Sequence, residues 1–267
     1  MSAGFDWRRP PGLPVFAGAF LVFLYAPLLL LVVYSFNAGQ LVTIWEGFSL
    51  RWFVKVAQNP DIRGAAANSL IIAASSTCIA TVLAIPAALA LERSRSFPGH
   101  GGAGNLLSMP LVVPEIVTAI TTLIFFSSIG LAPGLVNLII AHSVFCIPFA
   151  LLPIRARLRD LGQVYEDAGR DLYANPWALF RTVTLPLIAP AIATGAVLAF
   201  VTSLDDFLIS QMVSGAGSTT LPVYVYGMMR LGITPEVNAI STILLLLSTA
   251  LVALALALAY RARRSRA

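Results

Sequence analysis

Six long runs of apolar residues, each free or nearly free of charge, dominate the pattern along this chain. A helix needs about 20 such residues to cross the hydrocarbon core of a bilayer. The third and fourth runs are separated only by a turn-forming cluster that contains two glycines and a proline. The pattern therefore predicts an all-α, polytopic membrane protein with a single transmembrane domain over residues 1–267. Its six spans are expected at residues 14–36, 66–91, 106–129, 134–154, 187–212 and 237–259.

The composition supports this interpretation. Hydrophobic residues make up 58% of the chain and charged residues 11%, whereas soluble domains average about 45–50% and about 25%. A chain with so little charge does not cover a water-facing surface, which excludes a soluble enzyme, a disordered chain and a nucleic-acid binder. The two cysteines, Cys78 and Cys146, lie in apolar runs and are expected to behave as small core residues.

The positions of the basic residues predict the orientation. With six spans, thirteen of the 17 lysines and arginines lie on the side that holds both termini, and cytoplasmic segments carry such an excess. We therefore expect a multi-pass membrane protein with both termini in the cytoplasm. The thirteen are Arg8, Arg9, Arg93, Arg95, Arg155, Arg157, Arg159, Arg170, Arg181, Arg261, Arg263, Arg264 and Arg266.

The longest predicted cytoplasmic segment is residues 155–186. Residues 164–172 have the spacing of a short amphipathic helix. Asn175 and Pro176 follow as a capping residue and a first-turn proline, so a second short helix should begin there. The sequence thus predicts two short helices joined by a tight turn.

Two predicted external segments, residues 37–65 and 213–236, connect the spans on the other side. Ser49 is placed to cap a short helix that carries Trp52. Thr234, Pro235 and Glu236 form a cap, a first-turn proline and an acid that favours a helix N-terminus, so the last helix should begin there.

Three acids fall at membrane depth, where an ionised group is costly and usually faces a cavity or a partner. Glu115 shares a helical stripe with Ser108, Thr118 and Thr122, and two prolines, at positions 110 and 114, should distort that helix. Glu115 and Thr118 are therefore candidates for a translocation path. The competing interpretation is a structural, paired carboxyl.

Asp205 and Asp206 are the other two acids. On a continuous helix, adjacent residues point about 100° apart, so the two carboxyl groups are expected to have different surroundings. Asp206 shares the more polar face with Ser203 and Ser210 and is the candidate for the path. Asp205 is the less favoured candidate for the path, because it is rather expected in a helix–helix contact or a capping interaction. The lone His142 is expected in a packed, hydrogen-bonded position.

No catalytic motif accompanies these features. The one lysine, Lys55, lies in no glycine-rich phosphate-binding loop, and neither a His-Glu-x-x-His zinc motif nor a Gly-x-Ser-x-Gly elbow occurs. We expect no catalytic residue, no metal site and no cofactor in this chain.

The predicted cytoplasmic loop resembles the Glu-Ala-Ala loop of ABC importer permeases. Asp167-Ala168-Gly169, three residues, Tyr173, nine residues and then Val183-Thr184-Leu185-Pro186 follow the family spacing of Glu-Ala-Ala, Gly and Ile-x-Leu-Pro. Asp167, Gly169 and Tyr173 depart from the family residues. The resemblance implies the type I importer permease fold and a loop that inserts into a separate ATPase subunit, which binds ATP and magnesium. The loop residues so implicated are Glu166, Asp167, Ala168, Gly169, Tyr173, Asn175, Pro176, Leu185 and Pro186.

Further motifs resemble the polyamine (putrescine/spermidine) branch of that family. The branch implies a permease subunit for cationic polyamines that lies in the lipid bilayer of the bacterial inner membrane. Its implied partners are a second homologous permease, two ATPase subunits and an external substrate-binding protein. Relatives import ferric iron, thiamine, opines or phosphonates, which are alternative cargoes. The motifs are Leu41-Val42-Thr43 with Trp45, Pro110 to Glu115, Leu204 to Phe207, Val213 to Gly215, Thr219 to Pro222 and Thr234 to Ala239.

Two other classes of protein lack support in the sequence. A stand-alone carrier driven by an ion gradient needs internal inverted repeats or a set of coupling sites, and the sequence shows neither. A membrane-embedded enzyme needs a nucleophile with its base or a metal motif, and the sequence offers no support for one.

Overall fold

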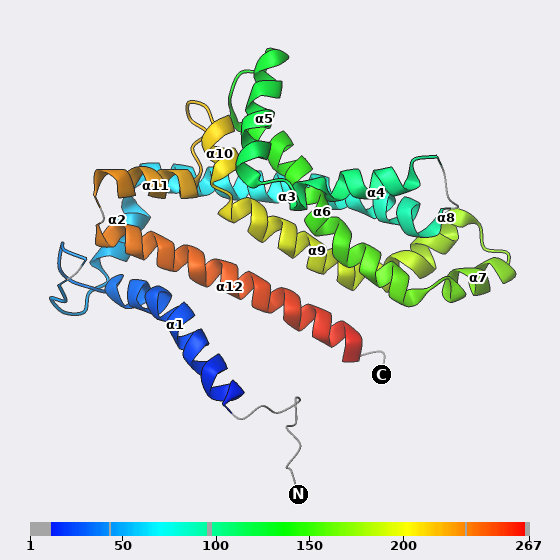
Figure 1. Cartoon of the computed structure of the whole chain (residues 1–267), viewed down its shortest axis with the longest axis horizontal. Coiled ribbons are helices and arrows are strands. Elements are labelled where there is room, and N and C mark those ends of the chain that lie inside the picture. Colours follow the sequence, from blue (N-terminus) through cyan, green and yellow to red (C-terminus); the bar gives the residue numbers. More distant parts are fainter. Residues whose placement is uncertain (1–11, 43, 95–97, 233, 265–267) are drawn as a thin grey trace, which may run out of the picture. The chain divides into compact units, whose positions relative to one another are not determined.

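A computed structural model describes residues 12–42, 44–94, 98–232 and 234–264, and most of these residues are helical (Figure 1). Arg8, Arg9, Thr43, Arg95 and Arg266, used in the predictions above, lie outside the described residues. The elements are α1 (Leu13–Tyr34), α2 (Arg51–Gln58), α3 (Pro60–Arg93), α4 (His100–Ser108), the 3-10 turn η1 (Met109–Leu111), α5 (Glu115–Ser128), α6 (Leu135–Leu161), α7 (Val164–Asp171), α8 (Pro176–Leu179), the π-helical turn η2 (Phe180–Thr184), α9 (Leu185–Asp205), α10 (Leu208–Val213), α11 (Leu221–Leu231) and α12 (Pro235–Arg264).

The all-α, multi-span prediction is confirmed. Within the described residues, five helical segments are long and apolar enough to cross a membrane, and a bent pair of helices raises the number to six. The five are Leu13–Tyr34, Pro60–Arg93, Leu135–Leu161, Pro176–Asp205 and Pro235–Ala253.

The third predicted span is a broken helix. The chain bends by 104° between the segments His100–Leu111 and Glu115–Ser128. Pro114, which lies between them, has an extended backbone (ψ 132°). Proline removes a backbone donor and disfavours a helical residue before it. The predicted distortion is therefore confirmed, but the single helix over 106–129 is wrong. Glu115 begins α5 and does not lie within a continuous helix.

The fifth predicted span also ends early. It was expected to run through residue 212, but α9 ends at Asp205 and α10 starts at Leu208. The predicted external segment 213–236 contains a further helix, α11, that the sequence analysis did not anticipate.

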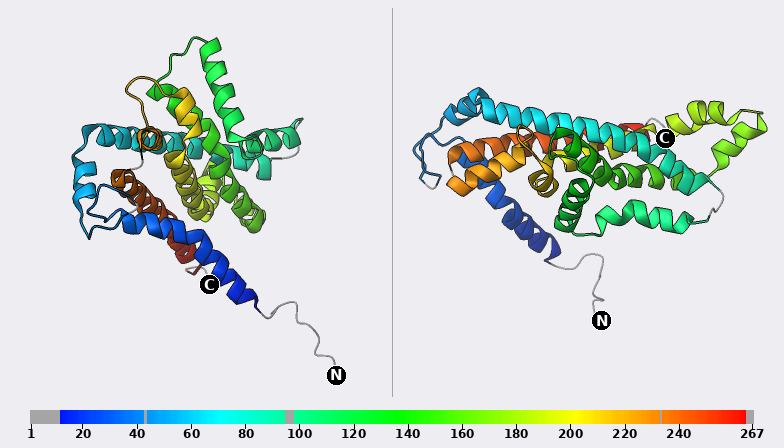
Figure 2. Two further views of the ribbon diagram at one scale, coloured as in Figure 1. Left: turned by 60° about the vertical axis from the view of Figure 1, so that its left-hand side comes forward. Right: turned by 90° about the horizontal axis from the view of Figure 1, so that it is seen from above.

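The chain divides into two compact units. One contains residues 60–226 and 246–267, and the other contains residues 1–59 and 227–245. In the larger unit, α3, α6 and α9 pack against one another, and α5 packs against α10 (Figures 1 and 2). Helix α6 begins near α5 and α10 and ends at α7, so it connects the two ends of this unit.

Small residues allow the three core helices to approach closely. Ala80, Ala84 and Ala88 form a stripe with four-residue spacing on α3, and each is fully buried. On α9, a Cβ atom at Gly195 would lie 2.6 Å from the carbonyl oxygen of Ala150 in α6. Contacts between small residues are typical of helices that pack within membranes.

The smaller unit is organised around Asn37, which is fully buried. Its side-chain amide donates to the carbonyl oxygens of Leu41 and Ile44, and its side-chain oxygen accepts from the backbone of Gly39 and Glu46. The backbone oxygen of Asn37 accepts a 2.9 Å hydrogen bond from Trp52 Nε1 in α2. The predicted short helix after Ser49 is confirmed, and the loop before it is folded onto that helix.

Candidate functional site

The first candidate region is the 164–186 loop, where the two predicted short helices form. Helix α7 is followed by a turn, and α8 begins at Pro176. Asn175 caps α8 because its Oδ1 accepts a 2.7 Å hydrogen bond from the backbone N–H of Ala178. Leu185 and Pro186 open α9 directly after η2, so they extend the loop into a long helix.

Tyr173 holds the turn in a left-handed conformation, with φ of 60°, as the one non-glycine residue of positive φ in the described chain. The backbone N–H of Tyr173 donates to Arg170, and that of Ala174 donates to Gly169. These bonds satisfy carbonyl groups at the end of α7. The turn that a glycine would favour is therefore made by a tyrosine, at a cost in backbone strain.

Gly169 serves a different purpose. A Cβ atom at this position would collide with the side chain of Leu179 in α8. The absent side chain leaves room for Leu179, and the flexible end of Leu179 would have to shift to accommodate a Cβ atom at position 169.

Glu166 anchors α7 to the helical core. Its side chain is buried, and its Oε2 lies 2.7 Å from Nε of Arg93 at the end of α3. Thr184 Oγ1 donates to the other carboxylate oxygen. Arg93 also donates to the carbonyl oxygens of Leu158 and Gly162 at the end of α6. One arginine thus joins α3, α6 and the loop.

Glu92 adds a second tie beside the first. Its two carboxylate oxygens accept hydrogen bonds from Nε of Arg155 (2.7 Å) and Nε of Arg159 (2.9 Å), both on α6. The sequence pattern did not predict these pairs. Acids and arginines at the ends of apolar runs on the same predicted side were the signal that pointed to them.

Four apolar or aromatic side chains of the 164–186 loop are exposed. Tyr173 is 97% exposed, Leu172 81%, Trp177 68% and Tyr165 54%. Large apolar side chains that are exposed mark candidate sites of interaction with another molecule. Asp167 and Ala168, predicted as loop residues with Glu166, lie on the exposed side, where Asp167 pairs with Arg170 at 2.8 Å.

The second candidate region is a buried polar cluster near the other end of α6. His142 Nδ1 lies 2.8 Å from Ser203 Oγ, and Nε2 lies 3.2 Å from Ser210 Oγ and 3.3 Å from Asp206 Oδ2. Ser203 Oγ is also 3.0 Å from Ser76 Oγ in α3. The packed, hydrogen-bonded position expected for His142 is confirmed, and the cluster joins α3, α6, α9 and α10.

Asp206 interrupts the helix between α9 and α10. Its backbone is extended (ψ 126°), and its carboxylate accepts from the backbone N–H groups of Ile209 and Ser210. The continuous helix assumed for Asp205 and Asp206 is therefore wrong, because Asp206 caps α10 instead of continuing α9. Asp205, expected in the packed or capping position, is exposed, whereas Asp206 is buried.

Glu115 meets this cluster from α5. Its carboxyl group lies close to that of Asp206, so the two candidate acids predicted from separate runs lie together. Thr118 and Thr122 are half-buried on the same helix. The placement brings Glu115 and Asp206 into one site and leaves Asp205 at its exposed edge; their role in a path stays a prediction.

The chain is similar in sequence to known transport proteins. Residues 80–266 match the family described as binding-protein-dependent transport system inner membrane component. The chain is 41% identical over 229 residues to the putrescine transport system permease protein PotI of Escherichia coli (strain K12), covering 84% of this chain and 82% of that protein. It is 36% identical over 237 residues to the spermidine/putrescine transport system permease protein PotC of the same organism, covering 89% of each.

Solved structures share the fold at low sequence identity. A bacterial ABC transporter that imports the acidic polysaccharide alginate superposes with a TM-score of 0.66 at 17% identity, covering 87% of this chain and 90% of that chain. The MetNI methionine ABC transporter in an inward-facing conformation gives a TM-score of 0.63 at 20% identity, covering 75% and 95%. These likenesses establish the fold of the helical bundle.

Proposed function

We propose a function from one premise: this chain belongs to the family of binding-protein-dependent transport system inner membrane components. It is a multi-pass membrane protein and a transport permease subunit. The proposed complex is an ATP-driven importer, and its cargo is a cationic polyamine such as putrescine or spermidine. The observation that supports this cargo is the sequence identity, 41% and 36%, to two polyamine permeases over more than four-fifths of the chain.

The 164–186 loop is the proposed contact with the ATPase. Its exposed surface of Tyr165, Leu172, Tyr173 and Trp177 is suited to a groove on another subunit. ATP and magnesium are bound by two ATPase subunits, and this chain supplies no catalytic group. The loop is placed in the cytoplasm, with both termini, because of the excess of basic residues on that side.

The anchors at Arg93 and Glu92 suggest how movement is transmitted. When the ATPase subunits close, they displace the loop. The ion pair of Arg93 with Glu166 then carries that displacement to α3, and the arginines paired with Glu92 carry it to α6. Because α6 also carries His142, the same movement reaches the buried polar cluster.

The polar cluster is the proposed wall of the path. A polyamine carries two or more ammonium groups, which lose hydration in a narrow passage. Carboxyl groups of Glu115, Asp206 and Asp205, with the hydroxyl of Thr118, are placed to replace part of that hydration. A second, homologous permease completes the path, and an external binding protein delivers cargo to the segments at residues 37–65 and 213–236.

The cargo is tested on the purified complete complex. ATP turnover is measured with the binding protein loaded with putrescine, with spermidine or with an unrelated cargo. We expect stimulation by the polyamines alone. Equal stimulation by the unrelated cargo would remove the polyamine assignment and leave the permease role intact.

The ATPase contact is tested by cross-linking in a background lacking Cys78 and Cys146. A single cysteine at Leu172, which is 81% exposed, should cross-link to an ATPase subunit. The matched control is a cysteine at Val136, 68% exposed at the start of α6, which should not. Cross-linking from Val136 and none from Leu172 would place the loop on the wrong side of the membrane.

A further inference from the structure

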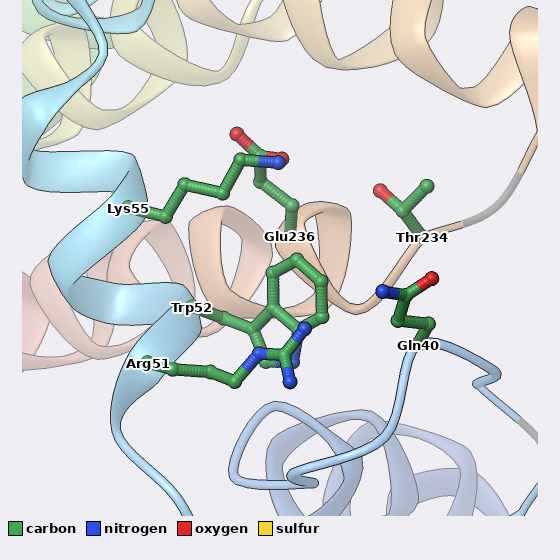
Figure 3. A pocket seen from close by; sticks show the side chains of 6 residues that line it. All are labelled: Gln40, Arg51, Trp52, Lys55, Thr234 and Glu236. Atoms are coloured by element: carbon green, nitrogen blue, oxygen red, sulfur yellow. The ribbon is translucent and has the colours of Figure 1, made fainter.

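A pocket in the smaller unit holds a side-chain ammonium group in surroundings that suit a free amine. The pocket has a volume of about 430 Å³ and is lined by Gln40, Arg51, Trp52, Lys55, Thr234 and Glu236 (Figure 3). This volume lies within the range of small-molecule sites, about 300–1,000 Å³. In the orientation proposed above, the pocket faces the outside of the membrane.

Lys55 places its ammonium group between an acid and an aromatic ring. Its Nζ lies 2.7 Å from Oε2 of Glu236 and 5.3 Å from the centroid of the Trp52 ring. A carboxylate and an aromatic face are the two groups that proteins commonly use to bind an organic cation. Figure 3 shows the lysine reaching from α2 to Glu236 at the start of α12.

The two partners of this ion pair differ in burial. The side chain of Glu236 is 6% exposed, whereas that of Lys55 is 59% exposed. The carboxylate is therefore a fixed part of the pocket, and the lysine enters it from the solvent side. Because the ammonium group of Lys55 stays largely in water, a cation that pairs with the buried Glu236 carboxylate can take its place. The carboxylate itself needs a positive partner, since a buried charge left unpaired is costly.

Trp52 is held firmly enough to serve as a binding surface. It is buried, and its Nε1 donates to the backbone of Asn37, the centre of the folded loop. The guanidinium group of Arg51 covers the ring at 4.4 Å and donates 2.7 Å to Ala38 O, which fixes it outside the Glu236 position. Two cations already lie against this ring, as expected for a cation-binding aromatic surface.

We propose that this pocket is an alkylammonium site, and that the side chain of Lys55 occupies it in place of one end of the cargo. A lysine side chain is a four-carbon stem with a terminal ammonium group, so it matches a butane-1,4-diamine ion except for the second ammonium group. One amine of the diamine replaces the Lys55 ammonium at Glu236. The second amine reaches the oxygens of Thr234 and Gln40 across the open part of the pocket.

This inference deepens the proposed function, on which the choice of a diamine rests. The pocket would receive cargo on the outer side before it reaches the path at Glu115 and Asp206. The displaced Lys55 would make the site available only to a cation able to compete with it. Monoamines and diamines both satisfy the Glu236 position, and a diamine gains the additional contacts.

The experiment titrates the complete complex in lipid nanodiscs, without nucleotide or binding protein, with butane-1,4-diamine and with n-butylamine by calorimetry. Lys55→Met removes the competing ammonium and keeps the length and apolar character of the stem. We expect it to bind both amines at least about fivefold more tightly than the unaltered chain, because the buried Glu236 carboxylate has lost the partner that competes with them.

Two acid variants locate that binding. Glu236→Gln in the Lys55→Met background should abolish the heat of amine binding. Glu236→Asp keeps the negative charge and should weaken amine binding without abolishing it. The matched control is Glu46→Gln. Glu46 is an exposed acid in the loop around Asn37, and it does not line the pocket. Basal ATP turnover of each complex shows whether it has assembled. If the complex with Glu236→Gln fails to assemble, the result with Glu236→Asp decides whether amine binding depends on Glu236.

The outcomes separate this site from the proposed cargo. Polyamine-stimulated ATP turnover with no amine binding in Lys55→Met overturns the pocket alone. Binding of n-butylamine that depends on Glu236 supports the pocket even when polyamines fail to stimulate turnover. A third outcome is that Lys55→Met binds no amine and its ATP turnover no longer rises with the binding protein. That result shows that Lys55 instead pairs with an acidic side chain of the binding protein, and it also overturns the proposal.

Discussion

The two ends of α6 hold polar groups by different chemistry. At the Leu161 end, three arginines and two glutamates form ion pairs at 2.7–2.9 Å, and Arg93 also binds two backbone carbonyl groups. At the Leu135 end, His142 and Asp206 are surrounded by serine hydroxyl groups and backbone N–H groups. The first region joins continuous helices to the loop, and the second surrounds a break between α9 and α10.

This difference indicates a division of mechanical roles. A guanidinium group presents its donors in a rigid fork, so its carboxylate and carbonyl partners are fixed in position and angle. Serine hydroxyl groups rotate and exchange partners at little cost. We interpret the arginine-rich end as a stiff connection for force, and the His142 end as an adjustable site that rearranges when a cation enters.

The largest expected effect tests the stiff connection. Glu166→Gln leaves the Arg93 charge, 14% exposed, without its anionic partner, and breaking a buried pair costs about 3–5 kcal/mol. We expect about 3 kcal/mol, because Arg93 keeps the carbonyl oxygens of Leu158 and Gly162. Thermal unfolding of the detergent-solubilised complex measures the loss of stability, and ATP turnover should become independent of the binding protein.

Asp167→Asn is the matched control for that variant. It makes the same chemical change one residue along, but the side chain is 58% exposed and its pair with Arg170 lies in solvent. An exposed pair contributes about 0–1 kcal/mol, so the unfolding midpoint should hardly move. Equal destabilisation by the two variants would contradict the buried anchor.

An intermediate effect is expected in the polar cluster. Asp206→Ala removes the cap of α10, worth about 1 kcal/mol, and leaves His142 with one fewer partner, worth about 1–3 kcal/mol. We expect a total loss of about 2 kcal/mol in thermal unfolding, while Asp205→Ala at the exposed neighbour should cost far less. If Asp205→Ala is the more damaging for stability, the assignment of the cap is wrong.

The smallest effect concerns the strained turn of the 164–186 loop. Tyr173→Gly relieves a left-handed conformation that costs a side-chain-bearing residue about 1–2 kcal/mol, partly offset by the greater freedom of glycine when unfolded. We expect a gain of about 0.5–1 kcal/mol. Leu172→Gly, at a position with φ of −87°, should lower stability instead, and thermal unfolding of both variants compares them.

Tyr173→Gly also removes an exposed aromatic ring from the proposed ATPase contact. Stability and transport should therefore change in opposite directions, with the unfolding midpoint rising and transport falling. A variant that gains stability and keeps full transport would show that the ring makes no essential contact.

The sequence by itself determined the membrane class, most of the long helices, and the helix pair of the 164–186 loop. These features depend on short-range signals: runs of apolar residues, the Asn175 cap with Pro176, and the prolines that break the third span. Such signals act within a few residues, because hydrophobic thickness and backbone geometry are local constraints.

Only the tertiary structure decided which polar groups meet. Glu166 and Asp167 are adjacent and chemically alike, yet one is buried against Arg93 and the other lies in solvent. Likewise, the helical spacing assumed for Asp205 and Asp206 fails because Asp206 caps a new helix and faces His142, 64 residues earlier in the chain. Burial and pairing depend on how separate helices pack, and the pattern within a single helix does not contain that information.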